Sequence, residues 1–240
     1  MKFDFSDLNI FRRIFKVGEK QAVNSKFAIV EGYKNARASL MFTLASCKNK
    51  NFAITSWGKG EGKSTAAANL ALSFSKTEKR VLLIDADLRR PSVHLLLKLN
   101  NSVGFSNLLS GEEEFENIVH RNVYPYLDIL PSGAIPPNPS ELLCSPLFTD
   151  FIEKIHNEYD YIIIDTPPVG VVSDALLLKD YIGGYVLIVK ERSTTHGDIK
   201  KAIKAFAQVN AKLLGLLKVG CQKKFRKYGK KSSEYYSSYY

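Results

Sequence analysis

The chain has 240 residues, of which 45% are hydrophobic, and a formal net charge of +10 at pH 7. This length allows one sizeable α/β domain with a full core. No apolar stretch approaches the roughly 20 residues that cross a bilayer, and the N-terminus lacks the hydrophobic core of a signal peptide. Cys47, Cys144 and Cys221 are odd in number and widely spaced, which argues against a disulfide framework or a zinc site.

Apolar runs alternate with amphipathic stretches along the chain. Strands are predicted over 51–56, 80–86, 126–130, 160–165, 184–190 and 213–219. Helices are predicted over 26–46, 63–76, 145–158 and 197–209. Strands that alternate with helices predict an α/β fold with a doubly wound, mostly parallel sheet flanked by helices. A proline-rich loop over 131–140 follows a predicted strand and is therefore expected at the ligand-binding edge of that sheet.

A glycine-rich loop joins the first predicted strand to the helix predicted from residue 63. Its backbone N–H groups and the positive end of the helix form a cradle for phosphate oxygens. Lys63 can bridge the β- and γ-phosphates, and Ser64 has the hydroxyl that P-loop proteins place on Mg²⁺. Trp57 stands where the strict pattern has glycine, so an ordinary glycine-rich turn is the alternative. The predicted ATP-binding residues are Gly58, Lys59, Gly60, Glu61, Gly62, Lys63, Ser64 and Thr65.

Two later apolar strands end in aspartates. Asp85 and Asp87 follow one strand, and Asp165 ends another. Carboxylates at the carboxyl edge of a parallel sheet would repel a triphosphate unless a cation lies between them, which implies Mg²⁺. For each aspartate alone, a solvated strand end or a helix cap is the alternative. The predicted metal-site residues are Ser64, Asp85, Asp87 and Asp165.

These segments resemble the bacterial tyrosine kinases (BY-kinases) of capsule and exopolysaccharide loci, in the separate-chain CpsD/CapB form. The resemblance runs from about residue 28 to the C-terminus. Gly60–Thr65 is similar to the Walker A motif of the family, Leu83–Pro91 to its Walker A′ and Ile162–Pro168 to its Walker B. It implies a P-loop NTPase fold of the MinD/ParA type and phosphoryl transfer from ATP to tyrosine. The catalytic residues it implies are Lys63, Asp85, Asp87 and Asp165, with Asp85 as a base toward the tyrosine hydroxyl.

The last thirteen positions are crowded with tyrosines and contain almost no aliphatic residues, so they are too polar to form a core. The resemblance implies that this cluster is autophosphorylated in trans. A soluble low-complexity terminus or an aromatic segment that binds a partner is the alternative. The predicted phosphoacceptors are Tyr228, Tyr235, Tyr236, Tyr239 and Tyr240.

The resemblance also implies partners and a place in the cell. Glu31, Lys34 and Arg37 match a helical motif for self-association, with Lys34 in place of its first arginine. The family forms homo-oligomers, in some cases rings, and depends on a membrane adaptor of the polysaccharide chain-length type. We therefore expect a cytoplasmic protein that the adaptor recruits to the inner face of the cell membrane.

Two terminal segments flank the predicted kinase domain of residues 26–220. Residues 1–25 are amphipathic at helical spacing, and the sequence leaves open whether they dock on the kinase body, a membrane partner or the bilayer. Residues 221–240 carry basic residues and then the tyrosines, and we interpret the basic run as a linker, with membrane contact second. No recognised nucleic-acid motif accompanies it, so no nucleic-acid partner is expected.

A second function remains open at this point. The wider relatives of the family are MinD/ParA-like ATPase switches without kinase activity, and they share the fold and much of the site. The tyrosine cluster and the run from Asp85 to Pro91 favour the kinase.

Overall fold

The computed structural model describes residues 22–47 and 49–220. Residues 1–21 of the predicted amphipathic segment and the whole predicted tail, residues 221–240, lie outside the described part, and so do all five predicted phosphoacceptors. The limits of the kinase domain therefore remain a prediction.

In the described part of the chain, seven strands form one sheet in the order β3-β4-β2-β5-β1-β6-β7. All neighbouring pairs are parallel except β3 and β4, which are antiparallel. The order changes direction along the chain as a doubly wound sheet requires, so the predicted fold class is confirmed. The strands are β1 (Asn51–Ser56), β2 (Val81–Asp85), β3 (His120–Tyr124), β4 (Leu127–Leu130), β5 (Tyr161–Asp165), β6 (Tyr185–Lys190) and β7 (Leu213–Val219).

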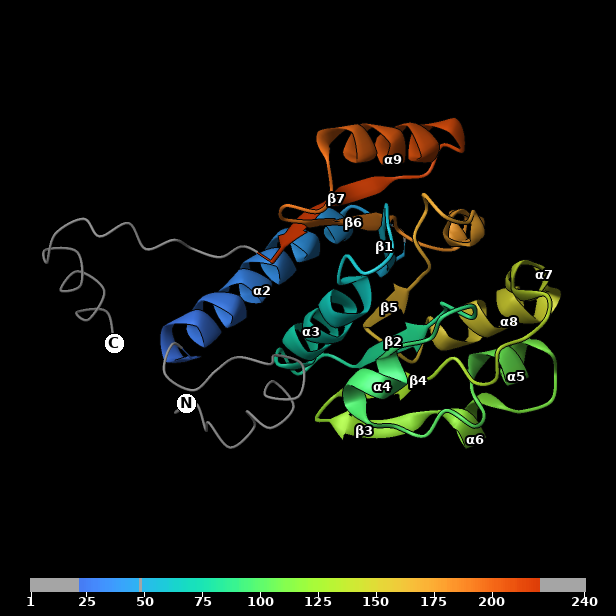
Figure 1. Cartoon of the computed structure of the whole chain (residues 1–240). Coiled ribbons are helices and arrows are strands. Elements are labelled where there is room, and N and C mark those ends of the chain that lie inside the picture. Colours follow the sequence, from blue (N-terminus) through green and yellow to red (C-terminus); the bar gives the residue numbers. More distant parts are fainter. Residues whose placement is uncertain (1–21, 48, 221–240) are drawn as a thin grey trace, which may run out of the picture.

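Helices cover both faces of the sheet, and α3 lies between α2 and the strands (Figure 1). Small side chains let α3 approach the sheet closely, and nearly all of its residues are buried. The long helices are α2 (Ala22–Ala45), α3 (Lys63–Ser75), α8 (Pro146–Ile155) and α9 (His196–Gln208). The short ones are α4 (Val93–Leu97), α5 (Phe105–Leu109), α6 (Phe115–Ile118), α7 (Pro139–Leu143) and the 3₁₀ helix η2 (Asp174–Leu178).

The central strands are buried on both faces. Successive side chains of a strand point to opposite faces of the sheet, and this alternation divides the core into two clusters. Phe52, Leu83 and Ile163 pack on the face that α2 and α3 cover. Ala53 and Leu82 pack on the opposite face with α5, α6, α8, η2 and α9. This burial on both faces explains why the strands read as unbroken apolar runs.

Every predicted strand and helix is present within a few residues of its predicted ends. The edge strand β3 and the short helices α4–α7 and η2 were not predicted. All five residues of β3 are at least partly exposed, and the strand has no apolar run. A helix of four or five residues is too short to show a helical period.

Candidate active site

The loop between β1 and α3 is held in a tight turn by two glycines. Gly60 and Gly62 have φ values of 71° and 88°, in the left-handed region that favours glycine. Gly62 is the N-cap of α3, so Lys63 and Ser64 are the first helical residues and lie at the positive end of the helix. The loop thus has the geometry of an anion cradle.

Glu61 supports this loop from within and is almost fully buried. Its carboxylate accepts hydrogen bonds from the backbone N–H of Gly58 at 3.0 Å and from the hydroxyl of Thr194 at 2.5 Å. Lys190 donates to the backbone oxygen of Gly60 at 2.9 Å. The loop after β6 therefore braces the phosphate loop. This contact was not predicted, because it joins residues about 130 positions apart.

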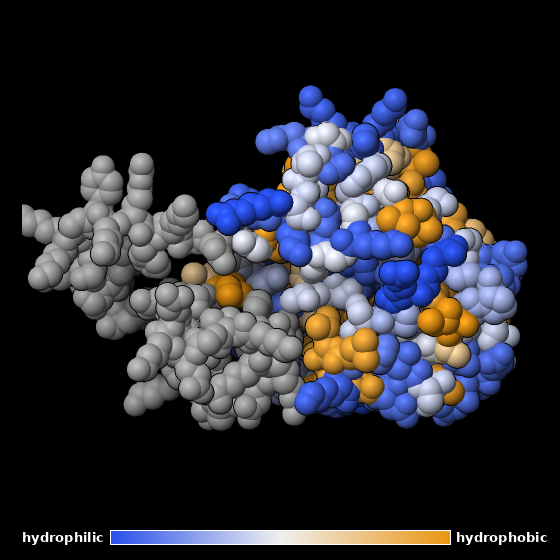
Figure 2. Space-filling model, in the orientation of Figure 1, coloured by the Kyte–Doolittle hydropathy of each residue, from blue (hydrophilic) through white to orange (hydrophobic). Residues whose placement is uncertain are grey.

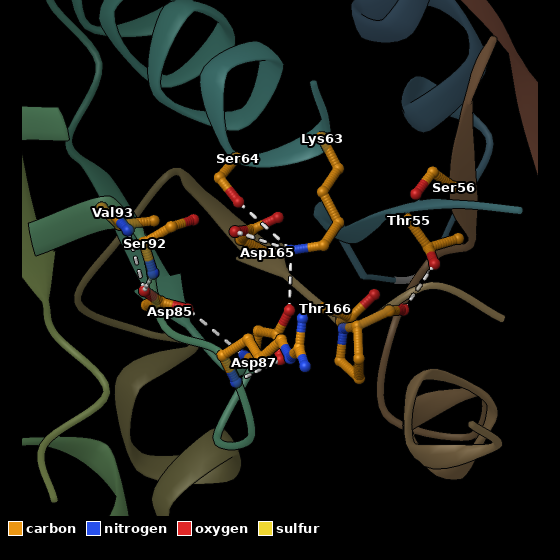
Figure 3. Close-up of polar contacts among 12 residues, drawn as sticks. Thr55, Ser56, Lys63, Ser64, Asp85, Asp87, Ser92, Val93, Asp165 and Thr166 are labelled. Carbon is orange, nitrogen blue, oxygen red and sulfur yellow. Dashed lines mark hydrogen bonds and ion pairs between the residues drawn. The ribbon is translucent and has the colours of Figure 1, made fainter. Parts of the chain in front are cut away.

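The aspartates of β2 and β5 meet because these two strands are neighbours. Asp85 and Asp165 are paired in register at the carboxyl ends of the parallel strands, and both are fully buried. Asp87 follows two residues after Asp85 and is also buried. Figure 3 shows that these carboxylates gather beneath the start of α3, where Lys63 reaches between them. The phosphate loop and the aspartates thus lie together at one edge of the sheet.

Lys63 is the cation at the centre of this cluster. Its Nζ lies 2.8 Å from Oδ2 of Asp87, 3.6 Å from Oδ2 of Asp165 and 3.2 Å from the hydroxyl of Ser64. Burial by itself would lower the pKa of Lys63, but the carboxylates of Asp165 and Asp87 together outweigh it and raise the pKa. Lys63 is therefore charged at neutral pH and is held where phosphate oxygens would lie.

Asp85 is held by backbone groups. Its Oδ2 accepts from the N–H groups of Ser92 and Val93, both at 3.0 Å, and its Oδ1 accepts from the N–H of Asp87 at 3.2 Å. Burial and the nearby charge of Asp165 nevertheless raise the pKa of Asp85 from its ordinary 3.8 to about 7. A carboxylate with that pKa can take up a proton near neutral pH, which is what a general base needs.

Asp165 differs because its buried oxygens have no hydrogen-bond partner among the described residues. Lys63 and Ser64 lie close enough to favour the charged form, but burial dominates and raises the pKa of Asp165. A buried, unsatisfied carboxylate is costly, and a bound cation would relieve that cost.

The donor set beside Asp165 fits Mg²⁺. Ser64 and Asp87 supply hard oxygens within the same cluster, and Mg²⁺ needs only a few protein oxygens because it keeps several waters. Within residues 22–47 and 49–220, no three His, Cys, Asp or Glu side chains form a ready cage for a metal ion. The arrangement thus suits an ion that is coordinated jointly by protein, phosphate and water. The described residues form no metal site made of protein ligands alone.

Arg89 connects three segments of the chain at the same edge of the sheet. Its guanidinium donates to Asp174 at 2.7 Å and to the hydroxyl of Ser140 at 3.0 Å. Ser140 also donates to Asp174 at 2.8 Å. The link joins the segment after β2 to the start of η2 and to α7, which follows the proline-rich loop. That loop thus lies at the edge where it was predicted, although the sequence did not reveal Asp174.

The residues predicted to mediate self-association lie on α2. Lys34 forms an ion pair with Glu31 at 2.7 Å within the helix, and the guanidinium of Arg37 donates to the backbone oxygen of Ser73 in α3. In the single chain, Arg37 therefore fastens α2 to α3. Its role in an oligomer remains a prediction.

The chain is similar to known proteins along most of its length. The family model described as AAA domain matches residues 49–214. The tyrosine-protein kinase YwqD of Bacillus subtilis is 39% identical over 209 residues, which are 87% of this chain and 86% of the relative. The chain belongs to the bacterial tyrosine kinases.

Solved structures agree with this assignment. The chimerical protein CapA2B2 matches with a TM-score of 0.74 and 35% identity, over 78% of this chain and 82% of that one. The septum site-determining protein MinD of Pyrococcus horikoshii, complexed with Mg-ADP, matches with a TM-score of 0.59 and 23% identity, over 70% of this chain and 69% of that one. The second likeness shows the shared P-loop fold alone.

The chain is therefore a protein-tyrosine kinase, an enzyme that transfers a phosphoryl group to tyrosine, built on a MinD-like fold. Among the described helices, none is both long and apolar enough to cross a membrane.

Proposed function

We propose that the chain binds Mg·ATP at the phosphate loop and transfers the γ-phosphoryl group to tyrosines near the C-terminus of a second copy. The observation that carries this proposal is the cluster of Lys63, Ser64, Asp87 and Asp165 at the positive end of α3. The cluster offers one buried cation for phosphate oxygens and hard oxygens for a divalent ion. We thus assign the binding and positioning of Mg·ATP to the serine, the two aspartates and the phosphate loop.

Ser64, Asp87 and Asp165 would hold Mg²⁺, with Asp85 as the further candidate from sequence. The ion, when bound, neutralises the charge of the phosphates. Lys63 holds the phosphate oxygens, and the N–H groups of the loop orient them. The enzyme then contributes mainly position and charge, as phosphoryl transfer generally requires.

Asp85 is proposed as the base that takes the proton of the tyrosine hydroxyl. Its raised pKa places its charge change near neutral pH. Oδ1 is its less engaged oxygen, because it accepts one hydrogen bond at 3.2 Å whereas Oδ2 accepts two at 3.0 Å. The proton would therefore go to Oδ1.

The proposed acceptors are Tyr228, Tyr235, Tyr236, Tyr239 and Tyr240, which lie outside the described residues. The end of the last strand supports transfer near this site. Val219, at the end of β7, lies beside the phosphate loop, since a Cβ on Gly62 would be 3.7 Å from its side chain. The segment that follows Gly220 therefore starts at the catalytic edge of the sheet.

We also propose that the kinase regulates the synthesis and export of capsular or extracellular polysaccharide. It would act as a homo-oligomer with a membrane adaptor of the chain-length type, in the cytoplasm at the inner face of the membrane. The likeness to the chimerical protein CapA2B2 supports an adaptor. The names CapB and EpsB of relatives that are 33% and 35% identical support the polysaccharide role.

The test is the intact mass of the full chain after incubation with Mg·ATP, with and without a candidate adaptor peptide. Wild type should gain mass in steps of one phosphate that map to the region 228–240, and Lys63→Met should gain none. Consumption of ATP with no gain of mass, even with the cognate adaptor, would contradict self-phosphorylation and favour a nucleotide switch.

A further inference from the structure

A second feature of the catalytic edge is an open groove beside the aspartates. It has a volume of about 610 Å³ and lies between the segment after β2, the start of α4 and the loop after β4. Asn101 bridges to Gly133 in that loop through two hydrogen bonds of 3.0 and 2.9 Å, which fixes one wall. Its lining includes two arginines and two aliphatic residues, Arg89, Arg90, Leu95 and Ile135.

The groove is positively charged and partly apolar. None of the described residues that line it is acidic. Arg89 is paired with Asp174, but the exposed guanidinium of Arg90 has no hydrogen bond or ion pair with any described residue. Leu95 and Ile135 are 69% and 64% exposed and offer apolar surface to a ligand. Figure 2 shows a hydrophobic patch over the surface where Figure 1 places α4. Such a surface fits a peptide that is both anionic and aromatic.

The position of the groove connects it with the reaction. Arg90 comes three residues after Asp87, and its backbone N–H donates to Oδ1 of Asp87 at 3.0 Å. The backbone N–H groups of Ser92 and Val93, at the start of α4, hold Asp85. A peptide in the groove therefore lies against the same short segment that carries both catalytic aspartates.

One segment of this chain has the matching chemistry. Residues 232–240 contain four tyrosines, one acidic residue, Glu234, and no basic residue, whereas residues 223–231 carry the basic run. The arginines attract the first stretch and repel the second, so the charge pattern sets which stretch enters the groove. Thirteen residues separate Gly220 from Glu234, and extended they reach about 43 Å, which allows contact with another subunit.

We infer that the groove is the acceptor-docking surface of the kinase. It takes the segment Glu234–Tyr240 of a second copy, with Arg90 paired to Glu234 and tyrosine rings packed on Leu95 and Ile135. This inference rests on the proposed function and deepens it, because it makes an acidic residue directly before the acceptor Tyr235 a determinant of specificity. Arg90 is then a specificity residue that touches the substrate away from the transferred phosphoryl group.

A charge swap between two full-length chains tests the inference. The acceptor is the Lys63→Met chain with an affinity tag, so that its mass differs from that of the enzyme and it cannot phosphorylate itself. Initial rates are measured against acceptor concentration, with the adaptor peptide present if wild type needs it. Arg90→Glu in the enzyme should raise the acceptor KM about tenfold and change kcat less than about twofold. Glu234→Lys in the acceptor should have the same effect on wild-type enzyme.

The two changes combined should restore the KM to within about threefold of the wild-type pair, because the ion pair is rebuilt with its charges exchanged. Lys200→Glu, a charge reversal on an exposed residue of α9, is the matched control and should leave the KM unchanged. An unchanged KM in Arg90→Glu would overturn the inference. The inference would also be overturned if Arg90→Glu raised the KM and the Glu234→Lys acceptor did not lower it again. That result would indicate a structural effect of the Arg90→Glu substitution.

Failure of the proposed function gives a different result. If wild type phosphorylates no acceptor under any condition, the proposed function fails, and the groove is tested by the affinity of a labelled 232–240 peptide for the full chain. Arg90→Glu should then weaken peptide binding about tenfold, and a Glu234→Lys peptide should recover it. Equal affinity of the peptide for wild type and Arg90→Glu would overturn the docking surface independently.

Discussion

The cluster around Lys63 and the groove beside Arg90 lie at the same edge of the sheet but are built in opposite ways. The cluster is buried, and its charges face one another at distances of 2.8–3.6 Å. The groove is open, and Arg90 and two aliphatic side chains face solvent. Chemistry on a phosphate needs fixed charges in a dry site, whereas docking of a chain segment needs an accessible surface. Changes in the cluster should therefore affect rate, and changes in the groove should affect recognition.

The largest effect should come from removal of the cation in the cluster. Lys63→Met removes the positive charge that would contact the phosphate oxygens, and we expect phosphoryl transfer to fall roughly a thousandfold or more. Rates of phosphate incorporation into an added acceptor chain measure this loss. Lys200→Met, on the exposed side of α9, is the control and should keep the wild-type rate. A loss of less than tenfold in Lys63→Met would contradict a central role for the buried cation.

Two buried carboxylates near the site should respond to substitution in opposite ways. Asp165 has no hydrogen-bond partner within the described part of the chain, whereas Asp174 is paired with Arg89. Asp165→Asn removes an unfavourable buried charge, so we expect transfer to fall about a hundredfold while the ligand-free protein becomes more stable. Asp174→Asn removes charge-assisted hydrogen bonds and should lower the free energy of unfolding by about 1–3 kcal/mol. Urea unfolding without nucleotide measures both, and shifts of the same sign would contradict the comparison.

A pH effect on stability should follow from Asp85. Its pKa is about 7 in the folded chain and near 3.8 in an unfolded one, so the folded state binds more protons between these values. The free energy of unfolding should therefore fall as the pH rises from about 4 to about 7, and Asp165 acts in the same direction. Asp85→Asn should make this slope shallower.

Urea unfolding at pH 5.0, inside that window, and at pH 7.5, just above it, gives the change of unfolding free energy with pH for each variant. Asp198→Asn is the control, because hydrogen bonds from Thr195 lower the pKa of Asp198, which therefore stays ionised throughout. An equal slope in wild type and Asp85→Asn would rule out a raised pKa for Asp85.

The smallest effect concerns the brace behind the phosphate loop. Thr194→Val removes the hydroxyl that donates to Glu61, and we expect a loss of about 1 kcal/mol in stability and a few-fold weaker nucleotide binding. Thr149→Val, which removes a hydroxyl bonded to Tyr181 on another part of the fold, should lower stability similarly without weakening nucleotide binding. Nucleotide titrations distinguish the two. Equal affinities in both variants would show that the brace is only structural.

Much of the site could be predicted because its parts are local. The phosphate loop lies between a strand and a helix that are adjacent in sequence, and the aspartates end apolar runs. Parallel strands carry such residues to one edge, so the convergence of Lys63, Asp85 and Asp165 follows from fold class alone. The difference in their hydrogen bonding did not follow, because Asp85 accepts hydrogen bonds from backbone N–H groups while Asp165 has no partner among the residues that the structure describes.

The sequence by itself determined the fold class and the positions of the phosphate loop and the aspartates in the chain. Alternating periodicity and short motifs depend only on residues that are neighbours in the chain. Only the tertiary structure decided the brace from Thr194 to Glu61, the link from Arg89 to Asp174 and the groove beside Arg90. Each of these joins residues that lie tens of positions apart or more, and no local pattern records which loops will meet. Burial and partner choice, which set the pKa of Asp85, are likewise properties of the packed molecule.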